Sequence, residues 1–146
     1  MDIHIAYIAG IFDGEGTVGI YTTQGTAPSP VLAVAGGHLP MLSAIRDHFG
    51  FGSVFLYGQT QYDDGVHRAP QTGRWQVRTW EGAVAVLSEL RPYLMEKAEQ
   101  ADVFLVAAAA RPGRGRRHTV ESRQQMEESA MALRRLKKPH RFPKDP

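Results

Sequence analysis

The 146-residue sequence contains no cysteine. This absence excludes a disulfide framework and a thiolate metal site, and it favours a reducing compartment. The longest uninterrupted apolar run, residues 103–110, is far too short to cross a bilayer, so we expect no membrane partner. No basic region followed by an apolar core opens the chain, so we expect no signal peptide and a cytoplasmic location.

Positive charge is scarce in the first two thirds of the chain. Residues 1–100 hold 6 Lys and Arg against 10 Asp and Glu, a net charge of −4, whereas residues 101–146 hold 11 against 5, a net charge of +6. Because neutralised phosphates supply much of the affinity of a DNA-binding protein, an acidic body argues against such a function. Binding to nucleic acid therefore needs either the basic C-terminal part or a body that gathers its few arginines on one face.

What is present is enough apolar sequence, 42% of residues, for one hydrophobic core. We expect a domain at 1–110 and a basic linker, helix and tail at 111–146. Periodicity predicts helices at 3–13, 40–49, 81–90, 92–110 and 119–137, and strands at 17–23, 31–35, 53–57 and 74–79. Glycine and proline predict a turn at 24–30 and a long hairpin loop at 58–73.

Residues 7–16, with the sequence Tyr-Ile-Ala-Gly-Ile-Phe-Asp-Gly-Glu-Gly, form the most informative segment. Ala6, Gly10 and Gly14 recur every fourth residue, with Ala9 beside them. A helix here would therefore carry a face of small residues, which lets another backbone approach closely. An ordinary N-terminal helix that stops at glycines is the simpler alternative.

The end of this helix carries an acid. We expect Gly14 and Gly16 to end the helix by adopting positive φ angles. Glu15 then lies at the negative end of the helix dipole. If two such helices pack together, two Glu15 carboxylates meet, an arrangement that only a bound cation makes favourable. The segment therefore predicts a divalent metal site.

Residues 8–16 resemble, position by position, the nine-letter signature of the LAGLIDADG homing endonucleases, with Glu15 in place of the second aspartate. The predicted order of elements is also similar to the αββαββα core of that family, over roughly residues 3–100. The resemblance implies an α+β fold with a four-stranded antiparallel saddle-like sheet, followed here by a helical, basic C-terminal extension. It also implies an intron-encoded, site-specific endonuclease that cuts both strands of double-stranded DNA.

A single copy of the motif implies, in this family, a homodimer and a long, near-palindromic target. The motif helices would form the dimer interface, and the residues assigned to it are Ala6, Ala9, Gly10 and Asp13. We expect Asp13 to support the helix end rather than to bind metal. A GxxxG spacing is weak support for pairing in water, because its best-attested setting is the membrane.

The resemblance also implies a cleavage pocket. Glu15 and the backbone of Gly14 would hold Mg²⁺, with Mn²⁺ as a substitute and Ca²⁺ binding without supporting cleavage. Lys97 looks like the lysine that single-motif members bring to the pocket to stabilise charge on the phosphate; a solvated lysine is the alternative. The family's water-ordering polar residue after the second strand is replaced here by residues 36–37, both glycine, which leaves that role to nearby His38 or to no residue.

The strand at 74–79 carries the clearest binding pattern. Arg74, Gln76 and Arg78 share one face, and Trp75 and Val77 point to the core. Arginine pairs with guanine and glutamine with adenine in the major groove, which admits a two-stranded ribbon. A half-buried strand with a solvated polar face explains the pattern equally well.

The same alternation extends to the other strands. It predicts further DNA contacts from Thr17, Gly19, Tyr21, Thr23, Ser53, Phe55 and Tyr57, and the loop at 58–73 adds Gln59, Gln61, Tyr62, His67 and Arg68. The strand at 31–35 offers only Val31, Ala33 and Ala35 on that face, so we expect sparse direct readout there.

Three functions remain open at this stage. The first is a homodimeric homing endonuclease. The second keeps the fold without cleavage, as a DNA-binding regulator or an RNA-binding intron maturase. The third is a small α/β interaction domain whose motif only dimerises and which has no affinity for nucleic acid.

Overall fold

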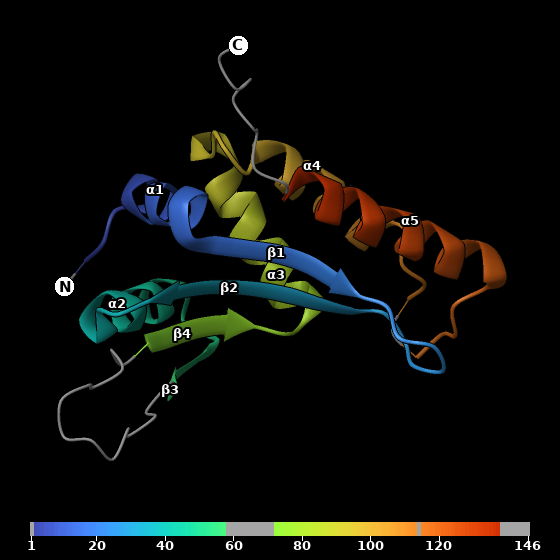
Figure 1. Ribbon diagram of the computed structural model, residues 1–146, viewed down its shortest axis with the longest axis horizontal. Helices are drawn as coiled ribbons and strands as arrows, with labels where there is room; N and C mark the ends of the chain where they lie inside the picture. The colour runs from blue at the N-terminus through green and yellow to red at the C-terminus, as the bar shows by residue number, and fades with distance from the viewer. Residues whose placement is uncertain (1, 58–71, 114, 138–146) are drawn as a thin grey trace, which may run out of the picture.

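The computed structural model describes residues 2–57, 72–113 and 115–137 (Figure 1). The elements, in chain order, are α1 (Ile5–Glu15), β1 (Gly16–Tyr21), β2 (Ser29–Gly36), α2 (Leu39–Phe49), β3 (Ser53–Tyr57), β4 (Thr72–Val77), α3 (Trp80–Leu90), the 3₁₀ turn η1 (Arg91–Tyr93), α4 (Ala98–Ala109) and α5 (Val120–Leu136). This order confirms the predicted α+β class and the succession of one helix, two strands, one helix, two strands and further helices.

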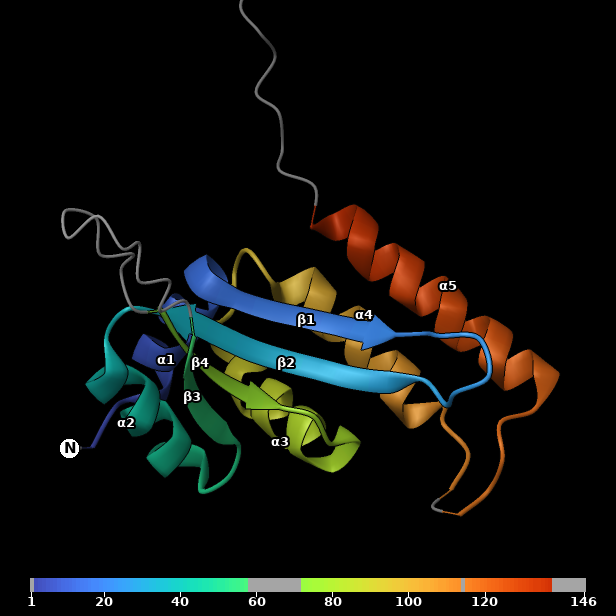
Figure 2. The same cartoon turned by 60° about the horizontal axis from the view of Figure 1, so that its bottom comes forward.

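In the described part of the chain the strands form an open antiparallel sheet of four, in the order β1-β2-β4-β3. The core lies on one side of this sheet, where Val18, Leu32 and Trp75 are fully buried. Helices α1, α3 and α4 lie behind the sheet on this side, as the two views in Figures 1 and 2 agree. No helix of the described residues covers the other face of the sheet over β4 and β3.

Strand β2 begins earlier than the sequence predicts. Residues Ser29 and Pro30, expected in the turn, pair with the end of β1, at Tyr21 and Ile20. Strand β4 pairs with β2 only from Leu32 onward, so Pro30 has β1 as its one neighbouring strand. Proline is tolerated at such edge-like positions because its missing amide removes no ladder hydrogen bond on the open side.

Helix α1 ends near the predicted residue, but the reason for glycine there differs from the one predicted. Gly14 lies within the helix, and Gly16 has a φ of −79° in extended backbone, so neither glycine supplies a positive φ. Gly16 is required for a different reason. A Cβ atom there would overlap the carbonyl oxygen of Phe12 and approach its ring to 2.7 Å, so only glycine lets the chain turn sharply from α1 into β1.

The single helix predicted at 92–110 is wrong. The structure has η1, then a non-helical segment, and α4 begins only at Ala98. The Asp13 carboxylate accepts hydrogen bonds from the backbone amides of Met95 (2.9 Å) and Lys97 (3.0 Å). Those amides donate to Asp13 of α1 and not to carbonyl oxygens of a preceding helical turn. This contact joins segments far apart in the sequence, so hydrophobic periodicity could not predict it.

Helix α5 is integrated with the body of the protein. Its predicted start is confirmed, since the Thr119 side chain accepts a hydrogen bond from the Ser122 amide (3.1 Å) as an N-cap. Met126, Ala130 and Leu133 are buried, and the helix packs against α4 and along β1. Among the described residues, no helix is both long and apolar enough to cross a membrane.

Replacing Leu133 by alanine tests whether α5 belongs to the cooperative core. Leu133 is buried, so we expect Leu133→Ala to lower the free energy of unfolding by about 2–5 kcal/mol. Met131 is exposed on the same helix, so Met131→Ala should change it by less than about 0.5 kcal/mol. Urea unfolding of both variants measures the difference. Equal and small effects would show that α5 unfolds independently.

Candidate cleavage site and nucleic-acid interface

The acid of the motif stands at the end of α1. Glu15 is the last residue of the helix and is exposed, and Gly14 beside it is also exposed. Within the described residues, the Glu15 carboxylate has no hydrogen-bond or ion-pair partner. A carboxylate at the negative end of a helix dipole concentrates negative charge where a cation is attracted.

One chain supplies only part of a metal site. No group of three His, Cys, Asp or Glu side chains that could hold a metal ion is found in the part of the chain that the structure describes. The Asp13 carboxylate is committed to the Met95 and Lys97 amides. A single carboxylate and nearby carbonyl oxygens suit a hard cation such as Mg²⁺, which is usually held by one or two carboxylates together with substrate phosphates. The residues present therefore fit such an ion if DNA supplies the remaining oxygens.

Lys97 is brought to the same place by the contacts of Asp13. Its backbone amide is held by the Asp13 carboxylate, and its Nζ donates to the Asp13 carbonyl oxygen at 2.5 Å. The ammonium is thus fixed at the last turn of α1, two residues from Glu15. The Asp13 carboxylate thus supports the segment after η1 from the last turn of α1, through the amides of Met95 and Lys97.

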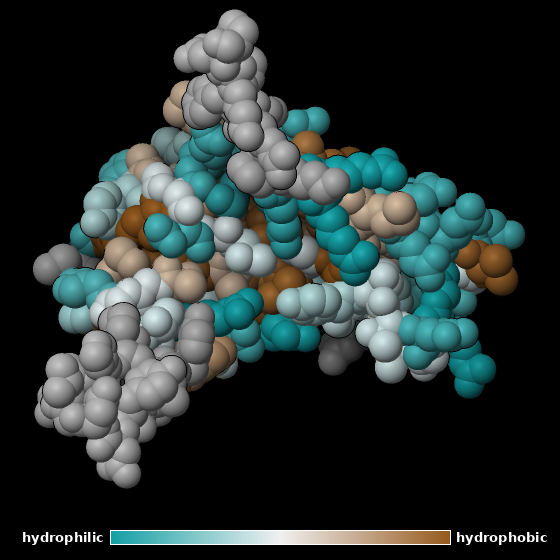
Figure 3. Space-filling model, viewed as in Figure 1, coloured by the Kyte–Doolittle hydropathy of each residue, from teal (hydrophilic) through white to brown (hydrophobic). Residues whose placement is uncertain are grey.

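The exposed face of α1 is smaller than the one predicted. Ala6, Gly10 and Gly14 are exposed on it, and a Cβ atom at either glycine would meet nothing within 4 Å. Tyr7 adds a large aromatic side chain that is 60% exposed, and Figure 3 shows brown and tan surface at α1. Ala9, assigned to this face from the sequence, lies in the core with no exposed area, because it packs with the residues beneath the sheet.

The alternation on β4 is confirmed. Trp75 and Val77 are buried, whereas Arg74 and Gln76 are half-buried on the opposite face. Arg78 follows the strand, and its guanidinium lies over the Tyr21 ring at 5.4 Å. These side chains form an outward row across the sheet.

Neighbouring strands extend this row. Arg74 is paired with Ala35 and Phe55, and Gln76 with Ala33 and Ser53. The Arg74 Nε atom is buried with no hydrogen-bond partner in the described part of the chain. Tyr57 closes β3 opposite Thr72.

The outward side of β1 and β2 is largely covered. Val31 and Ala33 are buried and carry no polar side-chain group, so the sparse direct readout expected of this strand stays a prediction. Gly19, predicted as a contact, is also buried, because the Val31 side chain and Lys137 Nζ lie beside it, the latter 3.4 Å from where a Cβ atom would stand. Thr17 is half-buried and Thr23 exposed at the two ends.

The predicted loop contacts cannot be placed. They are Gln59, Gln61, Tyr62, His67 and Arg68, and all lie outside the described residues. His38 occupies the N-cap position of α2, is exposed, and makes no capping hydrogen bond with its side chain. Its proposed role in ordering water stays a prediction.

A basic group at the end of α5 was missed by the sequence reasoning. Lys137 lies against the outward side of β1, and its pKa is lowered first by partial desolvation and then by the positive charges of Arg134 and Lys97. The run of basic residues near the C-terminus was the available signal. Only the packing of α5 along β1 shows that Lys137 returns to the acidic body, within electrostatic reach of Lys97.

Solved structures share this arrangement of elements. The homing endonuclease I-TnaI is 22% identical, with 94% of this chain and 95% of that chain covered and a TM-score of 0.71. The archaeal intron-encoded homing endonuclease I-Vdi141I, solved with DNA, is 17% identical over 95% and 88% of the two chains, with a TM-score of 0.70. The protein has the fold of the LAGLIDADG homing endonucleases. No protein-family model matches the sequence, and no curated protein matches it.

Longer proteins with the LAGLIDADG fold match over less of their length. The LAGLIDADG homing endonuclease I-GzeII, solved with a DNA target, is 15% identical, with 91% of this chain but only 44% of that chain covered and a TM-score of 0.65. One copy of the present chain therefore corresponds to less than half of that protein.

Replacing Asp13 by asparagine tests how far its carboxylate holds the site together. Asparagine keeps the shape but has one acceptor oxygen for two amide donors, so we expect Asp13→Asn to lower the free energy of unfolding by about 1–3 kcal/mol. Asp47→Asn, which removes an exposed carboxylate paired with Arg46 on α2, should cost less than about 1 kcal/mol. Chemical unfolding compares the two, and equal costs would contradict the role assigned to Asp13.

Proposed function

We propose that the protein is a site-specific, divalent-metal-dependent DNA endonuclease that acts as a homodimer. The observation that carries this proposal is that the end of one helix brings together the Glu15 carboxylate, which has no partner among the described residues, and the Lys97 ammonium, which is held on the Asp13 carbonyl oxygen two residues away. Carboxylate and ammonium are the groups needed, respectively, to hold a cation and to stabilise charge on a phosphate. The shared fold of several endonucleases solved with DNA supports the assignment.

In this proposal the Glu15 carboxylate and the Gly14 carbonyl hold Mg²⁺ against the scissile phosphate. When bound, such an ion would lower the pKa of an attacking water and would stabilise the negative charge that develops on the phosphate. Relatives in fold support the choice of ion, since I-CvuI has been solved on DNA with 2 mM Mg and with 2 mM Ca. We expect Mn²⁺ to replace Mg²⁺, and Ca²⁺ to bind without supporting cleavage.

Lys97 contributes a positive charge that does not depend on the metal. Its Nζ already donates to the carbonyl oxygen of Asp13, which keeps the ammonium near Glu15 in the absence of DNA. An ammonium positioned before the reaction stabilises charge that develops on the phosphate oxygens without costly reorganisation.

Two features support the homodimer: each chain has one Glu15, and α1 has an exposed face of mostly small residues. One chain offers one Glu15, so cutting two strands needs a second copy. The exposed face of Ala6, Tyr7, Gly10 and Gly14 on α1 is where two backbones can approach closely. Pairing through α1 brings both Glu15 carboxylates together, and the match to less than half of I-GzeII is consistent with a functional unit of two such folds.

The DNA contacts are assigned to the outward row of the sheet. Arg74, Gln76 and Arg78 supply donors suited to base edges, and Ser53, Phe55, Tyr57, Thr17, Tyr21 and Thr23 flank them. Gln59, Gln61 and Arg68 complete the predicted set. Gly19 is assigned only to the floor of this surface, beneath Lys137.

Replacing Glu15 by glutamine tests catalysis. Glutamine keeps the size but removes the charge that holds the cation, so we expect Glu15→Gln to lower the cleavage rate at least about 100-fold while binding persists. Glu128→Gln, an exposed change on α5, should leave the rate unaltered. The measurement is Mg²⁺-dependent cleavage of a randomised duplex library, followed by binding to the enriched sequence. Cleavage by Glu15→Gln at the wild-type rate would overturn the assignment.

A bulky residue on α1 tests the dimer. Because a Cβ atom at Gly10 meets nothing within its own chain, we expect Gly10→Leu to fold but to remain monomeric and to lose cleavage of both strands. Ala109→Leu, an exposed change at the end of α4, serves as the matched control and should stay dimeric. Sedimentation velocity gives the oligomeric state. A wild-type protein that sediments as a monomer on its cleaved target would contradict the proposal.

A second function is favoured by one feature. Gly36 and Gly37 offer no side chain to order an attacking water, and a protein of this fold without cleavage would serve as a DNA-binding regulator or an RNA-binding intron maturase. The randomised library separates the two cases, since a sequence that is enriched by binding yet never cut supports this alternative.

A further inference from the structure

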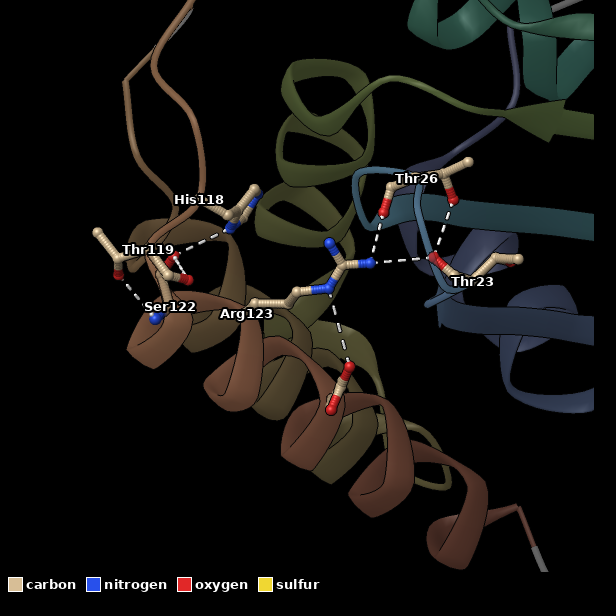
Figure 4. A network of polar contacts seen from close by, with 7 residues as sticks. Thr23, Thr26, His118, Thr119, Ser122 and Arg123 are labelled. Carbon is tan, nitrogen blue, oxygen red and sulfur yellow. Dashed lines mark hydrogen bonds and ion pairs between the residues drawn. The ribbon is translucent and has the colours of Figure 1, made fainter.

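Helix α5 holds the turn between β1 and β2 (residues 22–28) from outside the sheet. Arg123, the fourth residue of α5, donates from Nη2 to the carbonyl oxygens of Thr23 at 3.1 Å and Thr26 at 3.0 Å (Figure 4). These residues lie about a hundred positions apart in the sequence. One guanidinium nitrogen therefore fixes both ends of the tip of this turn.

The tip already has a defined backbone. The Thr26 amide and its hydroxyl both donate to the Thr23 carbonyl at 3.1 Å, and Gly25 has a φ of +85°, which favours glycine. With Arg123 added, the Thr23 carbonyl oxygen accepts three hydrogen bonds. The side chains from Thr23 to Thr26 remain exposed. The anchored turn is therefore a surface of fixed shape rather than part of the core.

Arg123 is itself oriented by its helix. Its Nε lies 3.9 Å from the Glu127 carboxylate one turn further along. The helix is anchored in turn by the Thr119 cap and by Met126 in the core. Contacts thus run without interruption from the core through α5 to the turn. Both Nε and Nη2 of Arg123 contact other groups of the protein. The guanidinium is therefore held against the turn and does not extend freely into solvent, as an arginine that binds phosphate would.

The turn lies far from the cleavage residues. Strand β1 spans six residues from Gly16, beside Glu15, to Tyr21, beside the turn. At about 3.3 Å per residue the strand is about 20 Å long. A duplex that follows the strand rises about 3.4 Å per base pair, so the turn stands about six base pairs from the cleavage point. Figure 1 shows the turn and α1 at opposite ends of β1.

We propose that Arg123 is a positioning residue for DNA specificity, which holds the β1–β2 turn so that its exposed residues contact the outer base pairs of each half-site. The proposal rests on the proposed function, because it needs a DNA target. Pre-forming the turn avoids the entropy cost of ordering it on binding, and that cost would otherwise reduce discrimination at the outer positions.

The experiment compares three variants with the wild type on the enriched target and on single base-pair changes of it. Arg123→Met keeps the aliphatic stem and removes the donors. Arg123→Lys keeps a positive charge and hydrogen-bond donors at the end of the side chain but lacks the Nε atom that contacts Glu127. Arg135→Met removes the same charge about three turns further along the same helix and is the matched control. Affinity is measured at each position and at several salt concentrations, together with amide hydrogen exchange of Thr26 in the free protein.

We expect Arg123→Met to reduce discrimination at the outer base pairs by roughly fivefold, with inner positions and the salt dependence unchanged and faster exchange at Thr26. Arg123→Lys should recover part of both effects, and Arg135→Met should leave the outer discrimination as in the wild type. A uniform loss of affinity with a salt slope reduced by about one would mean a direct phosphate contact and would overturn the proposal.

Two further outcomes also overturn it. Unchanged outer discrimination in Arg123→Met, on a target that the wild type binds specifically, removes the positioning role and leaves the proposed function standing. Failure of the wild type to enrich any duplex removes the proposed function, and this proposal with it. Measuring the wild type first therefore separates the two.

Discussion

The carboxylate of Asp13 connects the two segments that form the proposed cleavage site. The carboxylate accepts hydrogen bonds from the backbone amides of Met95 and Lys97, and the backbone carbonyl oxygen of Asp13 accepts one from the Lys97 ammonium. One residue thereby holds two amides of the segment before α4 and fixes the Lys97 ammonium at the last turn of α1, two residues from Glu15. Hydrogen bonds to a charged acceptor are stronger than neutral ones, which suits a contact between segments more than eighty residues apart.

The unequal charge of the chain has a structural resolution. An acidic body is a poor ligand for phosphate, but α5 packs along β1 and brings Lys137 to the outward side of β1, within electrostatic reach of Arg134 and Lys97. The pKa of Lys137 is lowered by partial desolvation and by repulsion from the positive charges of Arg134 and Lys97. A polyanion laid across this surface would relieve that repulsion, so the basic extension and the sheet form one candidate binding surface.

Helix α5 has a second consequence at the opposite end of β1. Its C-terminal end brings Lys137 within electrostatic reach of Lys97, and its N-terminal end holds the β1–β2 turn through Arg123. A single helix along β1 thus contacts both the proposed cleavage site at one end of the strand and the proposed recognition turn at the other. Figure 2 shows α5 running along the outer side of β1.

The sequence by itself determined the α+β class, the order of elements, the alternation on β4 and the placement of Glu15 at a helix end. Each of these follows from local periodicity or from a contiguous motif. It also predicted the N-cap at Thr119, because capping depends on neighbours in the chain.

Only the tertiary structure decided the features that depend on contacts between distant segments. The helix predicted at 92–110 breaks because Asp13 captures two of its amides, and Gly16 is needed for its closeness to Phe12 rather than for a positive φ. Ala9 turns inward, and Lys137 and Arg123 reach β1 and its turn. No local pattern reports such contacts, since each depends on which surfaces the packed core brings together.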